Sequence, residues 1–260
     1  MLWAFWFAAE GVPHLPTLLI FILGTVLTRS AGCAINDYAD RNFDAHVQRT
    51  RERPLATGAL SPKEALLTTA VLMGLAFLLV LLTNSLTIKL SFLAVILAVI
   101  YPFTKRYTHF PQVVLGAAFA CAVPMAFAAQ TNTIPATAWW LYLTAVIWAT
   151  AYDTLYAMAD RSDDLNIGIK STAIYFGRFD LLMVALLQGI VILLLAFTGF
   201  MHDRGAVFFT GLVCACGFIV HQLWTCRHRD PSLCLQAFLN NNWLGMCVFA
   251  ALVIDYQVVT

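Results

Sequence analysis

Long apolar segments alternate with short polar segments along the whole chain. A transmembrane helix needs roughly 20 apolar residues. Eight apolar segments, 15–23 residues long, are candidates; they cover residues 17–35, 65–82, 87–101, 112–129, 136–158, 181–200, 206–224 and 239–259. Another apolar segment, residues 2–9, is too short to cross a membrane and resembles the last turns of a longer helix. The pattern predicts an all-α, polytopic transmembrane bundle of eight full spans plus a truncated first helix, which forms one domain over residues 1–260.

The polar segments indicate where helices begin, end and bend. Ser61-Pro62-Lys63-Glu64 has the pattern of a capping box with proline in the first turn. Short polar turns are predicted at residues 11–13, 83–85 and 131–133. Pro124 lies inside one predicted span, where its missing N–H should bend the helix.

Composition and charge agree with a membrane protein. The chain is 61% hydrophobic and 11% charged, whereas soluble domains average roughly 45–50% and about 25%. The formal net charge is +1 and there is no basic stripe, so we expect no nucleic-acid partner. Twelve of the 15 Lys and Arg residues fall in alternate loops, and the positive-inside rule assigns these loops to the cytoplasmic side.

The cysteines carry no recognisable pattern. The seven residues, at positions 33, 121, 214, 216, 226, 234 and 247, show no spacing typical of a zinc site or a disulfide framework. Most of them lie in apolar segments. We therefore expect small apolar side chains rather than metal ligands or disulfide partners.

A first polar cluster follows directly on the first full span and reads Asn36-Asp37-Tyr38-Ala39-Asp40-Arg41-Asn42-Phe43-Asp44. On a helix, Asn36, Asp40 and Asp44 share one face, and Asp37 lies three residues before Asp40. Four oxygen donors on one face repel one another unless a cation lies among them. The simpler alternative is a solvated helix end with acidic side chains.

A second acidic cluster ends the predicted span 136–158 on the same side of the membrane. Asp153, Tyr156, Asp160 and Asp164 have the spacing of one helical face. Hard oxygen ligands suit Mg²⁺, which proteins bind through one or two carboxylates plus substrate phosphates. Because basic loops surround both clusters at the mouth of an apolar bundle, we expect a diphosphate substrate with a lipid tail. The alternative is that polar residues collect at a helix C-terminus.

Arg29 is unusual because it lies within a span, seven residues before Asn36 and two helical turns deeper. A charge at that depth normally has a partner. Arg29 is therefore either half of a structural ion pair, for instance with Asp153, or the group that binds the carboxylate of an acidic co-substrate. The basic residues nearer the surface also have a simpler explanation, because spans usually carry flanking charges on the cytoplasmic side.

Four motifs in these segments resemble those of the UbiA-type intramembrane prenyltransferases. Residues 36–44 fit the N-D-x-x-D-x-x-x-D signature, and Arg49-Thr50 with residues 53–58 continues it. Residues 160–164 fit D-x-x-x-D, and residues 101–105 fit Y-x-x-x-K. Residues 164–173 and 107–112 are most similar to the branch of the family that prenylates 4-hydroxybenzoate in ubiquinone biosynthesis.

The resemblance implies a nine-span fold in the bacterial inner membrane, with the lipid bilayer around it and the site facing the cytoplasm. Residues 2–9 would be what is present of the first span. It also implies Mg²⁺-dependent transfer of a polyprenyl group from polyprenyl diphosphate to the carbon ortho to the hydroxyl of 4-hydroxybenzoate. The product would be 3-polyprenyl-4-hydroxybenzoate.

The same hypothesis assigns roles to individual residues. The metal ligands would be Asn36, Asp40, Asp44, Asp160 and Asp164. The substrates would be bound by Arg29, Arg49, Arg53, Tyr101, Lys105 and Lys170. The catalytic candidates are Asp37, Asp153 and Tyr156, with Asp37 or Asp153 as the proton acceptor.

Two alternatives stay open at this point. A sister prenyltransferase acting on haem, chlorophyllide or a naphthoate would share the acidic motifs, and residues 168–173 argue against it without excluding it. A cation-coupled transporter would also contain acidic residues in its spans. Transporters usually place their binding groups near the midplane in broken helices, whereas these acids lie at one surface.

Overall fold

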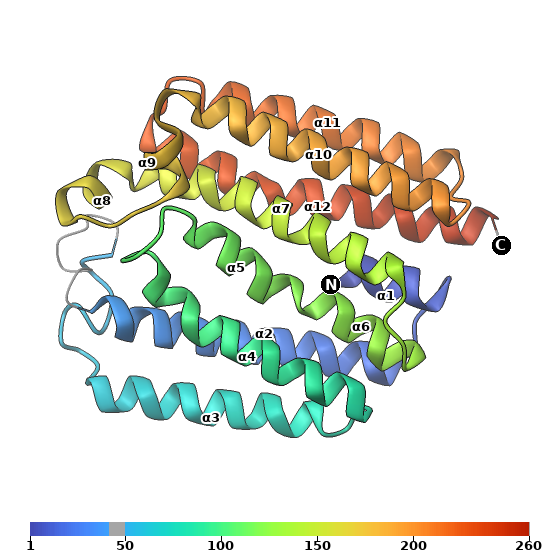
Figure 1. Cartoon of the computed structure of the whole chain (residues 1–260), viewed down its shortest axis with the longest axis horizontal. Helices are drawn as coiled ribbons and strands as arrows, with labels where there is room; N and C mark the ends of the chain where they lie inside the picture. The colour runs from blue at the N-terminus through green and yellow to red at the C-terminus, as the bar shows by residue number, and fades with distance from the viewer. Residues whose placement is uncertain (42–49, 260) are drawn as a thin grey trace.

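The computed structural model describes residues 1–41 and 50–259, and over these residues the chain is helical without a strand (Figure 1). The elements in chain order are α1 (Leu2–Ala9), α2 (Leu15–Asp40), α3 (Pro62–Val80), α4 (Ser85–Thr104), α5 (Pro111–Ala120), α6 (Ala122–Thr131), α7 (Ala136–Ala159), α8 (Arg161–Ile167), α9 (Thr172–Phe176), the 3-10 helix η2 (Gly177–Phe179), α10 (Asp180–Met201), α11 (Ala206–Thr225) and α12 (Pro231–Val259). The predicted all-α bundle is confirmed.

The predicted spans coincide with the long helices. Within the described part of the chain, seven helical segments are long and apolar enough to cross a membrane. The eighth predicted span is α7, whose 24 residues reach about 36 Å at 1.5 Å per residue. Its tryptophan, tyrosine and threonine side chains make α7 less hydrophobic than the other spans.

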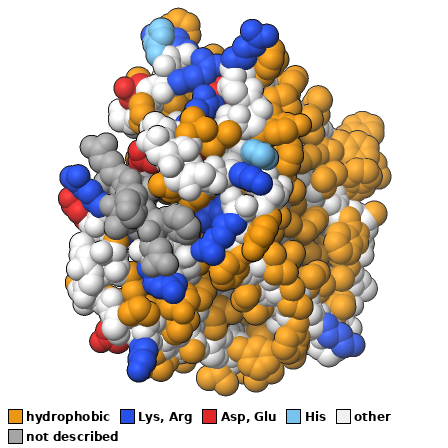
Figure 2. Space-filling model, turned by 60° about the vertical axis from the view of Figure 1, so that its left-hand side comes forward, with side chains coloured by type: hydrophobic (Ala, Val, Ile, Leu, Met, Phe, Trp, Pro, Cys, Tyr) orange, Lys and Arg blue, Asp and Glu red, His pale blue; other side chains and the backbone are white. Residues whose placement is uncertain are grey.

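The bundle is apolar on its outside as well as in its core. Many large hydrophobic side chains are strongly exposed, including Leu193 and Val213, each at 70%. Figure 2 shows that hydrophobic side chains cover the flank of the bundle, while Lys and Arg gather at the end that comes forward in this view. A continuous apolar flank of this kind fits hydrocarbon rather than water. The chain is an integral membrane protein.

Helix α7 lies at the centre of the arrangement. It packs against α5, α10 and α12, whereas α2 packs mainly on α3, and α11 on α12. Figure 1 shows α2, α3 and α4 along one side and α10, α11 and α12 along the other, with α5, α6 and α7 between them. The two acidic segments of the sequence, at the ends of α2 and α7, therefore come from different parts of the bundle.

The predicted start of α3 is confirmed in detail. The backbone N–H of Ser61 donates to Glu64 Oε2 at 2.8 Å, and the backbone N–H of Glu64 donates to Ser61 Oγ at 3.3 Å. This reciprocal pair is the capping box, and Pro62 occupies the first turn, where no N–H partner is needed.

The predicted bend at Pro124 is also confirmed. The span breaks at Cys121 into α5 and α6, three residues before the proline. The carbonyl of Ala117 accepts hydrogen bonds from Cys121 Sγ at 3.3 Å and from the Tyr142 hydroxyl at 3.4 Å. Side chains thus satisfy a backbone group next to the break, as an apolar environment requires.

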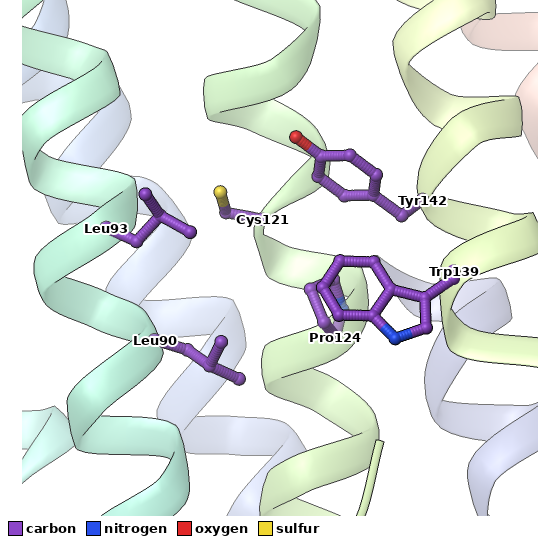
Figure 3. A pocket seen from close by; sticks show the side chains of 6 residues that line it. All are labelled: Leu90, Leu93, Cys121, Pro124, Trp139 and Tyr142. Atoms are coloured by element: carbon purple, nitrogen blue, oxygen red, sulfur yellow. The ribbon is translucent and has the colours of Figure 1, made fainter. Parts of the chain in front are cut away.

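A small apolar cavity lies beside this break. Its volume is about 70 Å³, and Figure 3 shows Leu90 and Leu93 on one side of it and Trp139 and Tyr142 on the other, with Cys121 and Pro124 between them. None of the predicted site residues lines it. The residues that line the cavity thus lie outside the acidic motifs.

The expectation that the cysteines form no disulfide is wrong for one pair. Cys226 and Cys234 are disulfide-bonded, with their Cα atoms 4.8 Å apart, and both are buried. The turn between α11 and α12 brings them together across eight positions of sequence. Cysteine spacing alone does not predict this disulfide, because it depends on the geometry of the turn between α11 and α12.

Helix α1 packs into the core by aromatic contacts. The Trp3 ring stacks on Trp148 of α7 with centroids 5.1 Å apart, and its Nε1 donates to the carbonyl of Gly245 at 3.3 Å. Phe5 and Phe7 are fully buried. The short first helix predicted from the sequence is thus a packed part of the bundle.

The close contact of α11 with α12 depends on one glycine. A Cβ atom at Gly211 would lie 2.2 Å from the Cβ of Ala251, whereas nothing lies within 4 Å of a Cβ at Gly217 on the same helix. We expect Gly211→Ala to lower the free energy of unfolding by about 1–3 kcal/mol, as overpacking does. Unfolding of the protein in detergent by heat or denaturant measures the loss.

Gly217→Ala is the matched control. The same methyl group is added there to an exposed helix position, so we expect no loss and a gain of up to about 1 kcal/mol from helix propensity. Equal stability of the two variants would contradict the assigned contact between α11 and α12.

Candidate active site

Most of the predicted site residues in the described part of the chain lie near the point where several helices end, at one end of the bundle, and Arg29 lies deeper on α2. Helix α2 ends at Asp40, α4 at Thr104 and α7 at Ala159, and Figure 1 places these ends beside α8 and α9. The long helices fix the backbone at each of these positions. The polar side chains therefore project from the last turns of rigid elements.

Asp40 forms the centre of the first acidic cluster. It is only 4% exposed, and its Oδ2 accepts a hydrogen bond from Lys105 Nζ in an ion pair. Its other oxygen, Oδ1, is buried and has no hydrogen-bond donor in the described part of the chain. A buried carboxylate oxygen without a partner is costly. Its chemistry fits an additional cation at this position.

The neighbouring acid, Asp37, accepts a hydrogen bond from Arg53. Arg53 Nη1 lies 2.7 Å from Asp37 Oδ1, and about a quarter of each side chain is exposed. Asn36 is half-buried on the same helix. The predicted metal ligand Asp44 and the predicted diphosphate-binding residue Arg49 lie outside the described residues.

The second acidic cluster is not one continuous helical face, which corrects the sequence-based expectation. Helix α7 ends at Ala159, and Asp160, with φ −94° and ψ 1°, joins it to α8. The backbone N–H of Asp164 donates to the carbonyl of Asp160 at 2.9 Å, so the two residues lie one turn apart. Asp153 and Tyr156 stay on α7, and the Tyr156 ring packs on Phe238 at 5.0 Å.

Residues of the two clusters lie within electrostatic range of one another. Asp153 of α7 interacts with Arg29 of α2, with Lys105 and with Asp160. The hydroxyl of Tyr101 on α4 interacts with Asp40, Asp153 and Tyr156. The structure therefore brings together residues from α2, α4 and α7 that lie far apart in the sequence.

The donor set fits Mg²⁺ in its chemistry but does not form a complete protein cage. Within residues 1–41 and 50–259, no three His, Cys, Asp or Glu side chains are close enough together to hold a metal ion. Mg²⁺ is typically bound by one or two carboxylates, with water and substrate phosphate supplying the other ligands. Asp40 offers a carboxylate of this kind, with one buried oxygen that has no hydrogen-bond donor among the described residues.

Arg29 has no ion-pair partner in the described part of the chain. It is exposed on α2, and its guanidinium lies 5.7 Å from the centroid of the Phe119 ring. Asp153 acts on it electrostatically but is not within ion-pairing distance. The group is thus held near the acids and remains able to receive an anionic partner.

Lys170 contacts the backbone of another loop. Its Nζ donates to the carbonyl of Tyr107 at 3.2 Å, and its backbone N–H donates to the carbonyl of Lys105 at 2.9 Å. These bonds join the connection after α8 to the connection after α4. Lys170 therefore serves to hold two loops together in this structure.

Two contacts at this end were not singled out from the sequence. Arg106 Nη2 donates to the carbonyl of Ala39 at 3.0 Å, beside Asp40. Asp180, at the start of α10, is fully buried and forms ion pairs with Arg161 and Arg229. The available signal for Asp180 was an acid at the beginning of an apolar span, close in sequence to basic residues.

Comparison with known proteins gives one family. Residues 1–247 match the family profile described as the UbiA prenyltransferase family. The chain is 55% identical over 255 residues to the 4-hydroxybenzoate octaprenyltransferase of Pseudomonas aeruginosa strain UCBPP-PA14, covering 98% of this chain and 86% of the relative. It is 54% identical to the protein of the same name from Alkalilimnicola ehrlichii, covering 98% of this chain and 87% of that one.

Solved structures share the fold at lower identity. A UbiA homologue from Aeropyrum pernix K1 in its apo form superimposes with a TM-score of 0.85 at 22% identity, covering 98% of this chain and 95% of that one. A UbiA homologue from Archaeoglobus fulgidus bound to GPP and Mg²⁺ gives a TM-score of 0.71 at 19% identity, covering 96% and 94%. By sequence over nearly its whole length, the chain belongs to the UbiA prenyltransferase family.

Proposed function

We propose that this protein transfers a polyprenyl group from polyprenyl diphosphate to the carbon ortho to the hydroxyl of 4-hydroxybenzoate. The product, 3-polyprenyl-4-hydroxybenzoate, would serve ubiquinone biosynthesis. The observation that carries the proposal is 55% identity, over 98% of the chain, to relatives named 4-hydroxybenzoate octaprenyltransferase. The acidic and basic side chains that converge at one end of the bundle supply groups suited to this reaction.

The acidic residues would bind the diphosphate end of the donor together with Mg²⁺. Asn36, Asp40, Asp44, Asp160 and Asp164 are the proposed ligands, and the unpartnered Oδ1 of Asp40 supports this assignment. Bound Mg²⁺ neutralises phosphate charge and makes diphosphate a better leaving group. The Mg²⁺ in the Archaeoglobus homologue agrees with this choice of metal.

Lys105 and Arg53 would take part in binding the diphosphate. In this structure each neutralises a carboxylate, Lys105 that of Asp40 and Arg53 that of Asp37. Both cations contact the aspartates at which the diphosphate would bind, and Arg49 is a further candidate. Substrate binding would exchange part of their contact with carboxylate for contact with phosphate, which keeps the total charge near balance.

Arg29 would orient the aromatic acceptor by binding its carboxylate. The C1–O bond of the donor breaks with its electron pair leaving on the diphosphate, and the ring carbon of the acceptor forms the new bond to C1. The ring proton then passes to a base. Asp153 is the better placed candidate, because it interacts with Arg29 and Tyr101, while Asp37 already accepts a hydrogen bond from Arg53.

The position of the site in the membrane follows from the same residues. The bundle has an apolar flank, and the acids lie at its polar end. An isoprenoid tail would remain in the apolar region while its diphosphate reaches the aspartates. The basic loops support a cytoplasmic site in a bacterial inner membrane.

The direct test is incubation of membranes containing the protein with labelled 4-hydroxybenzoate and a short prenyl diphosphate, with and without Mg²⁺. We expect prenylated 4-hydroxybenzoate only when Mg²⁺ is present. A naphthoate offered in parallel should remain unmodified. Preference for the naphthoate, or no transfer to either acid, would contradict the proposed acceptor.

The metal–diphosphate assignment predicts the effect of two isosteric substitutions. Asp40→Asn and Asp160→Asn should each lower Mg²⁺-dependent transfer by at least about 100-fold, because even residues that only orient metal ligands cost about 10–100-fold when changed. Initial rates over a series of Mg²⁺ concentrations measure the effect. Asp203→Asn, at an exposed carboxylate outside both motifs, is the control and should retain normal rates.

The acceptor assignment predicts a selective effect at Arg29. Arg29→Ala should raise the KM for 4-hydroxybenzoate about 10- to 100-fold, the equivalent of roughly 1.5–3 kcal/mol for a lost charged hydrogen bond. The KM for the prenyl donor should change little. The KM of Arg29→Lys for 4-hydroxybenzoate should lie between those of the unaltered protein and Arg29→Ala, since lysine keeps the charge but not the two parallel donors. Equal effects on both substrates would remove Arg29 from the acceptor site.

A further inference from the structure

Asp180 is a fully buried carboxylate that binds two arginines from different parts of the chain. It is the first residue of α10 and is 0% exposed. Its oxygens accept hydrogen bonds from Arg161 Nη2, from Arg229 Nε at 3.1 Å and Nη2 at 2.9 Å, and from the backbone N–H of Leu181 at 2.6 Å. One carboxylate thus connects three segments that the sequence separates.

Arg161 extends this connection to the second acidic motif. It is the residue directly after Asp160 and the first residue of α8. Besides its bond to Asp180, Arg161 Nη2 donates to the carbonyl of Ala173 at 2.7 Å. The guanidinium therefore anchors the corner between α7 and α8 to α9 and α10.

Helix α8 contributes no buried side chain to the described part of the structure. The Arg161 side chain anchors the beginning of the helix, and the bond from the Lys170 N–H to the Lys105 carbonyl anchors the chain after it. The direction of Asp160 and Asp164 should therefore depend on these polar anchors, because a short exposed helix is not stable by itself.

Arg229 holds Asp180 from the opposite side. It lies in the turn between α11 and α12, within the loop closed by the disulfide between Cys226 and Cys234, and has a left-handed φ of 59°. Its Nη2 also donates to the carbonyl of Arg178 at 2.9 Å. Hydrogen bonds to Asp180 raise the pKa of Arg229 above its ordinary value. Asp180 is thus also bound from the turn between α11 and α12, a segment separate from α8.

We propose that Asp180 is a positioning residue for the second acidic motif: by holding Arg161 it sets the direction of Asp160 and Asp164 toward the diphosphate. This role rests on the proposed function of that motif. Asp180 itself would not contact the substrate. It acts through Arg161, and Arg229 keeps the carboxylate in place.

Hydrogen–deuterium exchange tests the positioning directly and does not depend on activity. Asp180→Asn keeps the shape of the side chain but removes the charge that holds Arg161. We expect peptides covering residues 160–170 to exchange about tenfold faster in this variant, because their anchor is weakened. Unchanged exchange in these peptides would overturn the proposal.

Asp255→Asn is the matched control for a general loss of stability. Asp255 is also a fully buried carboxylate, and it accepts hydrogen bonds from the backbone N–H groups of Gly205 at 2.8 Å and Phe208 at 3.1 Å, at the start of α11. Figure 1 shows the start of α11 at the opposite end of the bundle from α8. This variant should destabilise the protein without faster exchange in residues 160–170.

Kinetic and binding measurements test whether the position of the second acidic motif, as set by Asp180, affects Mg²⁺-dependent transfer. In Asp180→Asn we expect the Mg²⁺ concentration for half-maximal transfer to rise about 10–100-fold, as for residues that orient metal ligands. The KM for 4-hydroxybenzoate should change less than twofold. The rise in Tm caused by Mg²⁺ with a prenyl diphosphate should be lost in Asp180→Asn and kept in Asp255→Asn. Equal changes in both variants would mean that Asp180 only stabilises the fold.

Two conservative variants test whether Asp180 acts through Arg161. They remain informative if Asp180→Asn fails to fold. Arg161→Lys should reproduce the faster exchange and the higher Mg²⁺ requirement, whereas Arg229→Lys should have a smaller effect on both, because Arg161 and Asp180 remain paired. Equal effects of Arg161→Lys and Arg229→Lys would contradict the proposal that Asp180 acts through Arg161. If the unaltered protein shows no Mg²⁺-dependent transfer, the proposed function fails, and the exchange experiment still decides the positioning.

Discussion

Charge compensation at the polar end of the bundle is the constraint on which the arrangement of the site depends. Acids placed where hydrocarbon ends are costly unless a cation lies beside them, and removing one partner of a buried pair costs about 3–5 kcal/mol. Lys105 holds Asp40, Arg53 holds Asp37, and Arg161 and Arg229 hold Asp180. The pairs of Lys105 with Asp40 and of Arg229 with Asp180 join segments 65 and 49 positions apart, so the same contacts that neutralise charge also hold separate helix ends together.

Helix α7 lies between the parts of the bundle that carry these ion pairs. It packs against α5, α10 and α12 and is therefore the span that connects the two sides of the bundle. Its buried positions are filled largely by alanine and threonine, which allow close approach of neighbouring helices. Asp153 lies on this central helix and Asp160 directly follows its last residue, whereas Asp37 and Asp40 come from α2. A site between these helices can therefore form only after the long-range packing is complete.

Local patterns were enough to predict the elements but not the contacts between them. The spans, the capping box at Ser61 and the bend at Pro124 follow from residues within a few positions of one another, and all are confirmed. The disulfide between Cys226 and Cys234 and the burial of Asp180 depend on the three-dimensional arrangement of separate segments. Hydrophobic periodicity carries no information about that arrangement. The acidic motifs were visible in the sequence because their residue types are rare in a membrane span.

The corner at Asp160 shows why a motif can be recognised while its geometry is not. A spacing of four residues was consistent with a continuation of α7, yet the helix ends one residue before Asp160, and a new short helix begins. In the first cluster, Asp37 and Asp40 thus lie in the last turn of a long helix, whereas Asp164 of the second cluster lies on a short helix without a buried residue. Helices held mainly by polar anchors open more readily than packed ones. Any adjustment of the site to a bulky diphosphate should therefore occur first at α8, with the first cluster as the fixed side.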